Sequence, residues 1–284
     1  MVNVSLVRNL LFTPADRPER FEKAVAVGAD GAILDLEDGV GLPSKEKARQ
    51  AALKFFQTPP AAPQGFIWAV RFNHVTTEDG LKDLLAFRAA PLKPKVVMLP
   101  KTESVTEVEI AVRHLKTGAG DAPQILALIE TGKGLGAAEA IASHPSVAAI
   151  AFGGADLAAD LHATLAWEPM LFARSRIAQA AAAAGIPAFD VPFLDIHDAA
   201  GLSKETQLVK ALGYSCKLAI HPAQIAPINA VFTPDSKELE RAERIVAAFK
   251  QAHGGACQVD GRMVDVPVVK AAQRTVALGE RKAA

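Results

Sequence analysis

The chain has 284 residues, of which 50% are hydrophobic, so it can bury a substantial core and is not disordered as a whole. Lysine and arginine together number 31, as do aspartate and glutamate, so the formal net charge is zero. Without a basic excess the chain lacks the electrostatic attraction that nucleic acids and anionic membrane surfaces require. We therefore expect small molecules and other copies of the chain as partners, and neither nucleic acid nor membrane.

Cysteine content and apolar run length bear on the compartment. Only Cys216 and Cys257 are present, too few for a disulfide framework or a structural zinc site, which indicates a reducing environment. Residues 1–8 do not combine a charged region with a long apolar run, and no stretch approaches the ~18 apolar residues of a membrane span. We expect a cytoplasmic protein.

Eight short apolar runs alternate with amphipathic or alanine-rich stretches, a pattern typical of parallel α/β proteins. Eight repeats fit a closed (β/α)8 TIM barrel better than an open doubly wound sheet, which is the alternative. The predicted helices include residues 20–27, 44–56, 105–117 and 170–184. The predicted strands are Asn9–Thr13, Gly31–Leu36, Phe66–Phe72, Lys95–Leu99, Gln124–Ile129, Val147–Phe152, Ile186–Val191 and Cys216–Ile220.

The chain continues past the eighth predicted strand, and we divide it into a barrel domain, residues 1–233, and a C-terminal helical extension, residues 234–284. Residues 234–253 predict a charged helix that two glycines then end. A last segment, residues 259–278, holds another helical stretch. Because a barrel does not require this extension, we expect the extension to have a function of its own.

Two consecutive predicted strands each lead to a carboxylate. Glu130 directly follows the fifth strand, and Asp156 follows the sixth after a glycine-rich turn. Parallel strands present their carboxyl ends at one edge of the sheet, where ligands and metals bind, so the two acids should lie close together. Without a neighbouring His or Cys, such a pair suits a hard cation such as Mg²⁺, which takes water and substrate oxygens as its other ligands.

Arg71 ends the third predicted strand. A guanidinium there can hold a substrate carboxylate in a bidentate pair while a cation on Glu130 and Asp156 chelates the oxygen α to that carboxylate. Together these groups describe a site for an α-keto or α-hydroxy acid. The alternative is an ordinary structural ion pair between Arg71 and a neighbouring acid.

Three further residues near strand ends are candidates for substrate binding. Asp35 and Glu37 are two positions apart, so they face the same side and can orient metal-bound water. The alternative is that they shape the turn at Asp38-Gly39 and cap the next helix. Arg17 lies near a helix start, where a carboxylate or phosphate can bind, although a solvated surface charge is the more common state of such a residue.

A glycine-rich segment, Gly132-Lys133-Gly134-Leu135-Gly136-Ala137, fits the loose Gly-x-Gly-x-x-Ala form of the dinucleotide-binding fingerprint. In that reading Asp156 is the acid that binds the ribose. Against it, Glu130 would lie close to the pyrophosphate, and Asp156 lies beyond a turn instead of at a strand end. An NAD-dependent dehydrogenase is therefore the second hypothesis.

Five motifs occur in order along the chain: Leu10-Leu11-Phe12-Thr13-Pro14-Ala15-Asp16-Arg17-Pro18-Glu19-Arg20, Asp35-Leu36-Glu37-Asp38-Gly39-Val40, Val70-Arg71-Phe72-Asn73, Ile129-Glu130-Thr131 and Phe152-Gly153-Gly154-Ala155-Asp156-Leu157. This collinear set resembles the citrate lyase β-subunit-like family, which includes malyl-CoA and citramalyl-CoA lyases. The resemblance extends from Asn9 to about Ala277.

The resemblance implies a barrel that binds Mg²⁺ through Glu130 and Asp156 and holds an oxaloacetate-, glyoxylate- or pyruvate-like keto acid with Arg71. It also implies that Asp265, in the tail, is the catalytic acid/base and reaches the site of a neighbouring copy, within a homotrimer or hexamer. The alternative for Asp265 is that it only caps a helix start.

Gly154 and Ala155 complete the candidate substrate-binding set, together with Arg17, Asp35, Glu37 and Arg71. Many members of the family carry an acid where this chain has Ala155, and a bulkier segment than the glycines after Glu130. These departures leave the metal pair intact and bear on the shape of the pocket, and hence on the substrate.

The leading hypothesis is a Mg²⁺-dependent carbon–carbon lyase that cleaves, or forms, a 3-hydroxyacyl-CoA dicarboxylate such as malyl-CoA or citramalyl-CoA. The products of cleavage would be an acyl-CoA and a 2-keto acid, with Asp265 moving a proton at the acyl carbon. The alternatives are a malyl-CoA-type thioesterase, a citrate lyase β subunit, the dehydrogenase, and a non-catalytic subunit that binds a metabolite.

Overall fold

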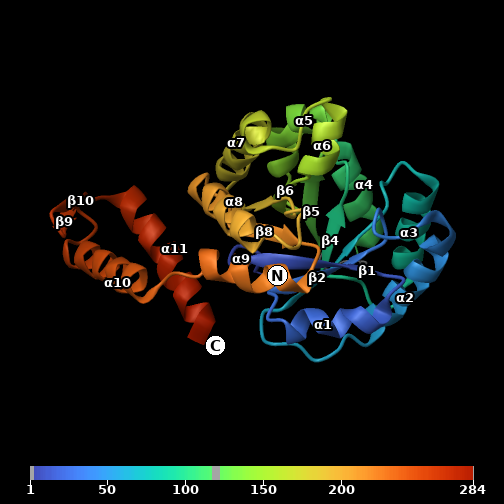
Figure 1. Cartoon of the computed structure of the whole chain (residues 1–284), viewed down its shortest axis with the longest axis horizontal. Helices are drawn as coiled ribbons and strands as arrows, with labels where there is room; N and C mark the ends of the chain where they lie inside the picture. The colour runs from blue at the N-terminus through green and yellow to red at the C-terminus, as the bar shows by residue number, and fades with distance from the viewer. Residues whose placement is uncertain (1–2, 117–121, 284) are drawn as a thin grey trace. The chain divides into compact units, whose positions relative to one another are not determined.

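The structure is a computed structural model that describes residues 3–116 and 122–283, the last three without their side chains. Eight parallel strands hydrogen-bond in chain order and close into a barrel, because β8 pairs with β1 as well as with β7 (Figure 1). Closure confirms the predicted TIM barrel and rules out the open sheet. The strands are β1 Asn9–Pro14, β2 Gly31–Asp35, β3 Ile67–Arg71, β4 Val96–Leu99, β5 Gln124–Ile129, β6 Val147–Phe152, β7 Ala188–Asp190 and β8 Cys216–Ala219.

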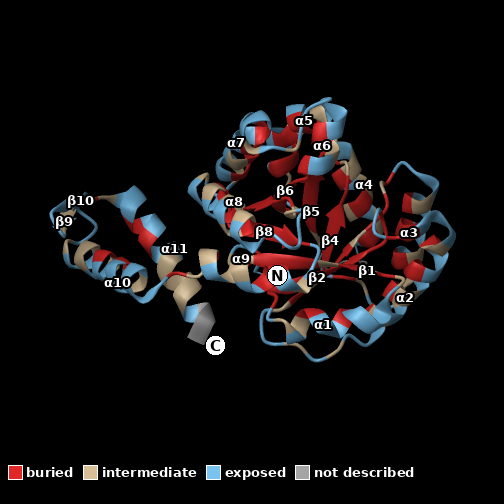
Figure 2. Ribbon diagram, viewed as in Figure 1, coloured by how far each residue is buried: buried red, intermediate tan, exposed pale blue. Residues whose placement is uncertain are grey.

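Helices surround the barrel, and their inner faces are buried (Figure 2). None in the described ranges is long and apolar enough to cross a membrane. The α-helices are α1 Phe21–Ala26, α2 Lys45–Gln57, α3 Glu78–Ala89, α4 Val105–Leu115, α5 Gly132–Ala142, α6 Gly154–Asp160, α7 Trp167–Ala184, α8 Ala199–Ala211 and α9 Ile225–Phe232. Short 3-10 helices cover Pro18–Arg20, Leu42–Ser44 and Pro222–Gln224.

The predicted and observed boundaries differ where proline acts on the backbone. The seventh strand begins at Ala188, later than predicted, because Pro187 has no N–H to donate to a ladder. Helix α7 begins at Trp167, earlier than predicted, since Pro169 lies in the first turn, where its missing N–H has no partner to lose. The predicted end of the fourth helix, Thr117, lies outside the described residues.

The barrel interior is filled with apolar side chains from alternate strand positions, as in closed eight-stranded barrels generally. The buried cluster includes Leu10, Ile33, Met98, Leu126 and Phe189. Because apolar side chains fill the interior, the polar side chains that can bind a ligand lie at the strand ends.

One buried ionic cluster supports the ends of β7 and β8. Asp190, fully buried, accepts from Arg174 Nε at 3.0 Å and from Lys217 Nζ at 2.5 Å. Lys217 also donates to Glu205 Oε1 at 2.7 Å. These buried charges are neutralised by one another and not by water. Removal of any one of them would leave a buried charge without its partner.

Asp190→Asn is expected to lower the free energy of unfolding by about 3 kcal/mol or more, because it leaves two buried cations sharing Glu205. Denaturant unfolding measures the effect. Lys82→Ala, which removes an exposed pair with Glu78, serves as control and should leave the midpoint almost unchanged. Equal midpoints for Asp190→Asn and the wild type would contradict the structural importance of the cluster.

Residues 229–284 form a second compact unit, whereas our sequence-based division falls after residue 233. Its elements are α10 Ser236–Gln251, the antiparallel strands β9 Cys257–Val259 and β10 Arg262–Val264, and α11 Val266–Ala283. Helices α10 and α11 share a small apolar core that includes Ile245, Val264 and Val269. The charged helix predicted for 234–253 corresponds to α10, which starts with a capping box at Asp235.

Candidate active site

A cavity of about 400 Å³ lies at the carboxyl-terminal ends of the barrel strands. Its polar lining comprises Asp35, Asp38, Arg71, Glu130 and Asp156. In TIM barrels this face carries the active site. The structure therefore brings both predicted metal ligands and the predicted substrate arginine into one space.

Arg71 is held by two carboxylates, one from β2 and one from the turn after it. Its Nε and Nη2 each donate to Asp35 at 2.7 Å, and its Nη1 lies 2.8 Å from Glu37 Oε2. The guanidinium carbon also lies 4.7 Å from the centre of the Phe12 ring. These contacts use three of the five N–H groups of a guanidinium, so among the described contacts one N–H on each terminal nitrogen stays available for a ligand.

Asp35 serves the turn as well as the arginine. Its oxygens accept the backbone N–H groups of Glu37 at 2.9 Å and Gly39 at 2.8 Å. A Cβ at Gly39 would lie 2.4 Å from the Asp35 carboxylate, so only glycine fits there. With four donors around it the carboxylate has its acceptor sites filled, and Asp35 orients Arg71 and shapes the turn together.

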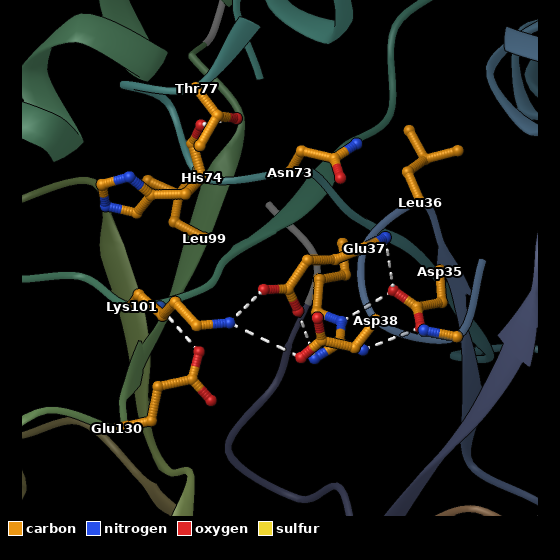
Figure 3. A network of polar contacts seen from close by, with 12 residues as sticks. Asp35, Leu36, Glu37, Asp38, Asn73, His74, Thr77, Leu99, Lys101 and Glu130 are labelled. Carbon is orange, nitrogen blue, oxygen red and sulfur yellow. Dashed lines mark hydrogen bonds and ion pairs between the residues drawn. The ribbon is translucent and has the colours of Figure 1, made fainter. Parts of the chain in front are cut away.

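Lys101, which is absent from our predicted site set, connects the arginine cluster to Glu130. Its Nζ lies 2.5 Å from Glu37 Oε1, and its backbone N–H donates to Glu130 Oε1 at 2.7 Å (Figure 3). The residue has a φ of 47°, which turns its N–H toward Glu130. Burial opposes the charged form of Lys101, but the hydrogen bond with Glu37 and the surrounding carboxylates outweigh burial and raise the pKa of Lys101.

Glu130 is a nearly fully buried carboxyl group at the end of β5. Burial raises its pKa to about 8, with Glu37 and Asp156 adding to the effect and Lys101 and Arg71 opposing it. Its position depends on Gly153, because a Cβ there would lie 2.5 Å from the Glu130 carboxylate. A carboxyl group held among other acids in this way has the environment of a cation ligand.

Asp156 lies in the first turn of α6, directly after β6, and lines the same cavity as Glu130. Among the described residues, no group of three or more His, Cys, Asp or Glu is arranged to hold a metal. Two carboxylates with oxygen donors only, and open cavity beside them, fit Mg²⁺, which retains water and takes substrate oxygens. The donor set does not fit zinc, whose sites typically have three or four protein ligands with His or Cys among them.

The remaining predicted site residues have different positions. Ala155 lines the cavity, while Gly154 packs against Phe152, whose ring a Cβ would meet at 2.6 Å. Arg17 is exposed and is not among the residues that line the cavity. Asp265 belongs to the second unit, where it precedes α11 and its Oδ1 accepts the Val268 N–H at 3.4 Å.

The glycine-rich segment that fits a dinucleotide fingerprint has a structural explanation. The Gly132 N–H donates to Asp160 Oδ2 at 2.7 Å, so a carboxylate of the chain occupies the place of a pyrophosphate. A Cβ at Gly134 would lie 2.5 Å from the Thr102 carbonyl oxygen. Gly134 therefore allows the start of α5 to lie close to the backbone that follows β4.

An eight-stranded barrel with acids, an arginine and a lysine at the carboxyl ends of its strands defines an enzyme of the (β/α)8 class. The profile of HpcH/HpaI aldolase/citrate lyase matches residues 8–222, and that of a C–C bond lyase of the TIM-barrel fold matches residues 172–280. The chain belongs to the HpcH/HpaI aldolase/citrate lyase family and is a carbon–carbon lyase, as the resemblance predicted.

Similar proteins span nearly the whole chain. Human mitochondrial citramalyl-CoA lyase is 33% identical over 290 residues, covering 95% of this chain and 85% of its own. A (3S)-malyl-CoA thioesterase of Cereibacter sphaeroides is 35% identical, and the match covers 98% of this chain and 96% of the thioesterase. The crystal structure of Mycobacterium tuberculosis CitE in complex with magnesium, acetoacetate and coenzyme A superposes with a TM-score of 0.78 at 35% identity, covering 96% and 97%.

Proposed function

We propose that the chain is a Mg²⁺-dependent lyase that cleaves, or forms, a 3-hydroxyacyl-CoA dicarboxylate such as malyl-CoA or citramalyl-CoA. The observation that carries the proposal is the single cavity in which Arg71 lies with Glu130 and Asp156. The similar CitE structure, which holds magnesium, a keto acid and coenzyme A, supports the same three ligand classes for this chain.

In this proposal Glu130 and Asp156 hold Mg²⁺, which supplies Lewis-acid polarisation of the oxygen α to the substrate carboxylate. The two free N–H groups of Arg71 bind that carboxylate, and Asp35 with Glu37 prevents the guanidinium from rotating. Lys101 balances the charge of Glu37 and, through its N–H, orients Glu130. The side chains thus present one fixed geometry to the hydroxy-acid end.

In cleavage the substrate hydroxyl gives its proton to solvent, the carbon–carbon bond breaks, and its electron pair stays on the acyl-CoA as an enolate that takes up one proton. Asp265 is proposed to protonate the enolate carbon, and to remove a proton there in the condensation direction. Asp265 reaches this carbon from a neighbouring copy, whose C-terminal extension packs against the barrel in a homotrimer or hexamer. Met263 and Val266, 70% and 50% exposed on either side of Asp265, support a covered position for this segment.

Thioester hydrolysis is the second candidate function, which the similarity to the (3S)-malyl-CoA thioesterase favours. The two reactions release different products from the same substrate. A lyase gives a 2-keto acid and an acyl-CoA without a free thiol, whereas a thioesterase gives free coenzyme A and the hydroxy acid. Measuring both products from malyl-CoA and citramalyl-CoA tests the proposal, and free thiol in step with substrate loss would overturn it.

A chain that binds Mg²⁺ and keto acid but turns over no thioester alone would instead be a subunit, as in a citrate lyase β subunit or a non-catalytic scaffold. The same assay includes this outcome, because Mg²⁺ binding is measured by calorimetry on the same preparation. The lyase proposal requires both binding and turnover from the isolated chain.

Mg²⁺ binding at pH 7 is expected to release about one proton, because burial raises the pKa of Glu130 to about 8 and the metal requires the carboxylate. The apparent affinity for Mg²⁺ should therefore rise with pH up to about 8 and level off above it. Calorimetry at pH 7 in two buffers of different ionisation enthalpy counts the released protons. A binding enthalpy that is equal in both buffers would contradict the protonated state of Glu130.

A further inference from the structure

The cavity has an apolar side that the proposed chemistry does not use. Val191, Pro192 and Leu194, in the loop after β7, line it together with Leu218 and Ile220 of the β8 end. In the closed strand order β7 is four strands from β3, which carries Arg71. The apolar side therefore lies across the barrel from the carboxylate-binding arginine.

The loop after β7 is held by side chains that take no part in the polar site. Lys217, fully buried, donates to the Val191 carbonyl at 2.8 Å while its other contacts are to Asp190 and Glu205. The Gln224 amide donates to the Phe193 carbonyl at 2.6 Å. Buried side chains thus hold the loop on either side of Pro192. The ionic cluster takes part in this, because its Lys217 donates to the loop backbone.

Gln224 also connects the loop to the end of β8. Its side-chain oxygen accepts the Ile220 N–H at 2.9 Å, while its amide holds Phe193. Gln224 itself is buried. Leu194 and Ile220 consequently belong to one apolar wall whose backbone is fixed by hydrogen bonds.

A second cavity of about 250 Å³ adjoins this wall. Val191, Pro192 and Leu194 line both cavities, so the loop separates them. The lining of the second cavity also includes the apolar Leu165 and Ala166 and the charged Arg174, Asp195 and Glu205. Leu194 lines both cavities and is 57% exposed. Its side chain therefore lies between the two cavities and does not pack in the core.

We propose that this wall receives an alkyl substituent on the acyl half of the thioester, and that Leu194 limits its length. The inference rests on the proposed lyase function, and it extends the acyl half from acetyl, which malyl-CoA and citramalyl-CoA release, to short acyl groups that carry an alkyl substituent. A propionyl group fills the space in front of Leu194, whereas longer acyl chains would need the volume behind it. One methylene more or less in an apolar pocket changes kcat/KM by about tenfold or more.

The test is the condensation of acyl-CoA probes of two, three, four and six carbons with the best keto acid among glyoxylate, pyruvate and oxaloacetate. The wild type should use propionyl-CoA at least as well as acetyl-CoA. Leu194→Ala should raise the hexanoyl-to-propionyl ratio of kcat/KM about tenfold, by joining the two cavities. Leu194→Phe should lower the butyryl-to-propionyl ratio by a similar factor. Leu92→Ala, a 54% exposed leucine outside both cavity linings, should leave every ratio unchanged.

The outcomes separate the two proposals. A wild type that condenses no acyl-CoA with any keto acid overturns the lyase function and the inference with it. An active wild type whose chain-length ratios stay within twofold in both Leu194 variants overturns the inference alone. Thermal midpoints accompany each variant, and the opposite directions expected for alanine and phenylalanine distinguish a change of pocket size from a general loss of activity.

Discussion

Glu130→Gln and Asp156→Asn are each expected to lower kcat/KM by about a thousandfold or more, since a Lewis acid supplies several kcal/mol to such a reaction. Both changes keep the volume of the side chain and remove the charge that holds Mg²⁺. Calorimetry should show that Mg²⁺ binding is lost together with turnover. Because Glu130 is buried as a carboxyl group with a pKa of about 8, its amide replacement should leave the fold intact.

Glu109→Gln is the matched control, because Glu109 is an exposed carboxylate on α4 outside the cavity lining. It should leave both metal affinity and turnover unchanged. Undiminished Mg²⁺ affinity and activity in either site variant would remove the metal assignment.

Asp265→Asn is expected to slow proton exchange at the acyl carbon by about a hundredfold to ten-thousandfold. Asparagine keeps the oxygen that accepts the Val268 N–H and is as good a helix cap as aspartate, but it transfers no proton. The measurement is deuterium incorporation into acetyl-CoA in heavy water. An Asp265→Asn variant that exchanges at the wild-type rate would show that Asp265 only caps α11.

Mixed oligomers test whether Asp265 acts in a neighbouring copy. Co-expressed Glu130→Gln and Asp265→Asn chains are each inactive alone, but random assembly in a ring should pair an intact barrel with an intact tail in about a quarter of the sites. Activity near that fraction supports the shared site. Activity no higher than that of either variant alone would place Asp265 outside the neighbour's chemistry.

The barrel could be predicted from the sequence because each strand and helix has a local sequence pattern, and this pattern is repeated eight times. Each buried parallel strand must be apolar on both faces, and each crossover needs a helix, so the eight units can be recognised one by one. The same reasoning found Glu130, which directly follows one such strand, and Asp156, which follows the next strand after a short turn. The prediction of strand boundaries was less accurate where a single backbone group determines where a strand begins. At Pro187 the missing N–H shortens the seventh strand.

The details of the site depend on contacts between distant segments, which a single sequence does not display. Lys101 follows the fourth predicted strand but was given no role, because its link to Glu130 uses the backbone N–H of a left-handed residue. Its position after the fourth strand was the only signal. An ion pair between Arg71 and an unspecified neighbouring acid was considered only as an alternative to carboxylate binding. The structure shows that the pairs of Arg71 with Asp35 and Glu37 coexist with a position in the cavity lining. Arg17 met the criterion of lying near a helix start, yet it is exposed and outside the cavity lining.

A crystal structure of the full chain with Mg²⁺ and oxaloacetate tests the central claim most directly. The expected result is a metal ion held by Glu130 and Asp156, with the carboxylate of the keto acid on the free N–H groups of Arg71. An ion bound elsewhere, or a keto acid whose carboxylate does not contact Arg71, would contradict the proposed site.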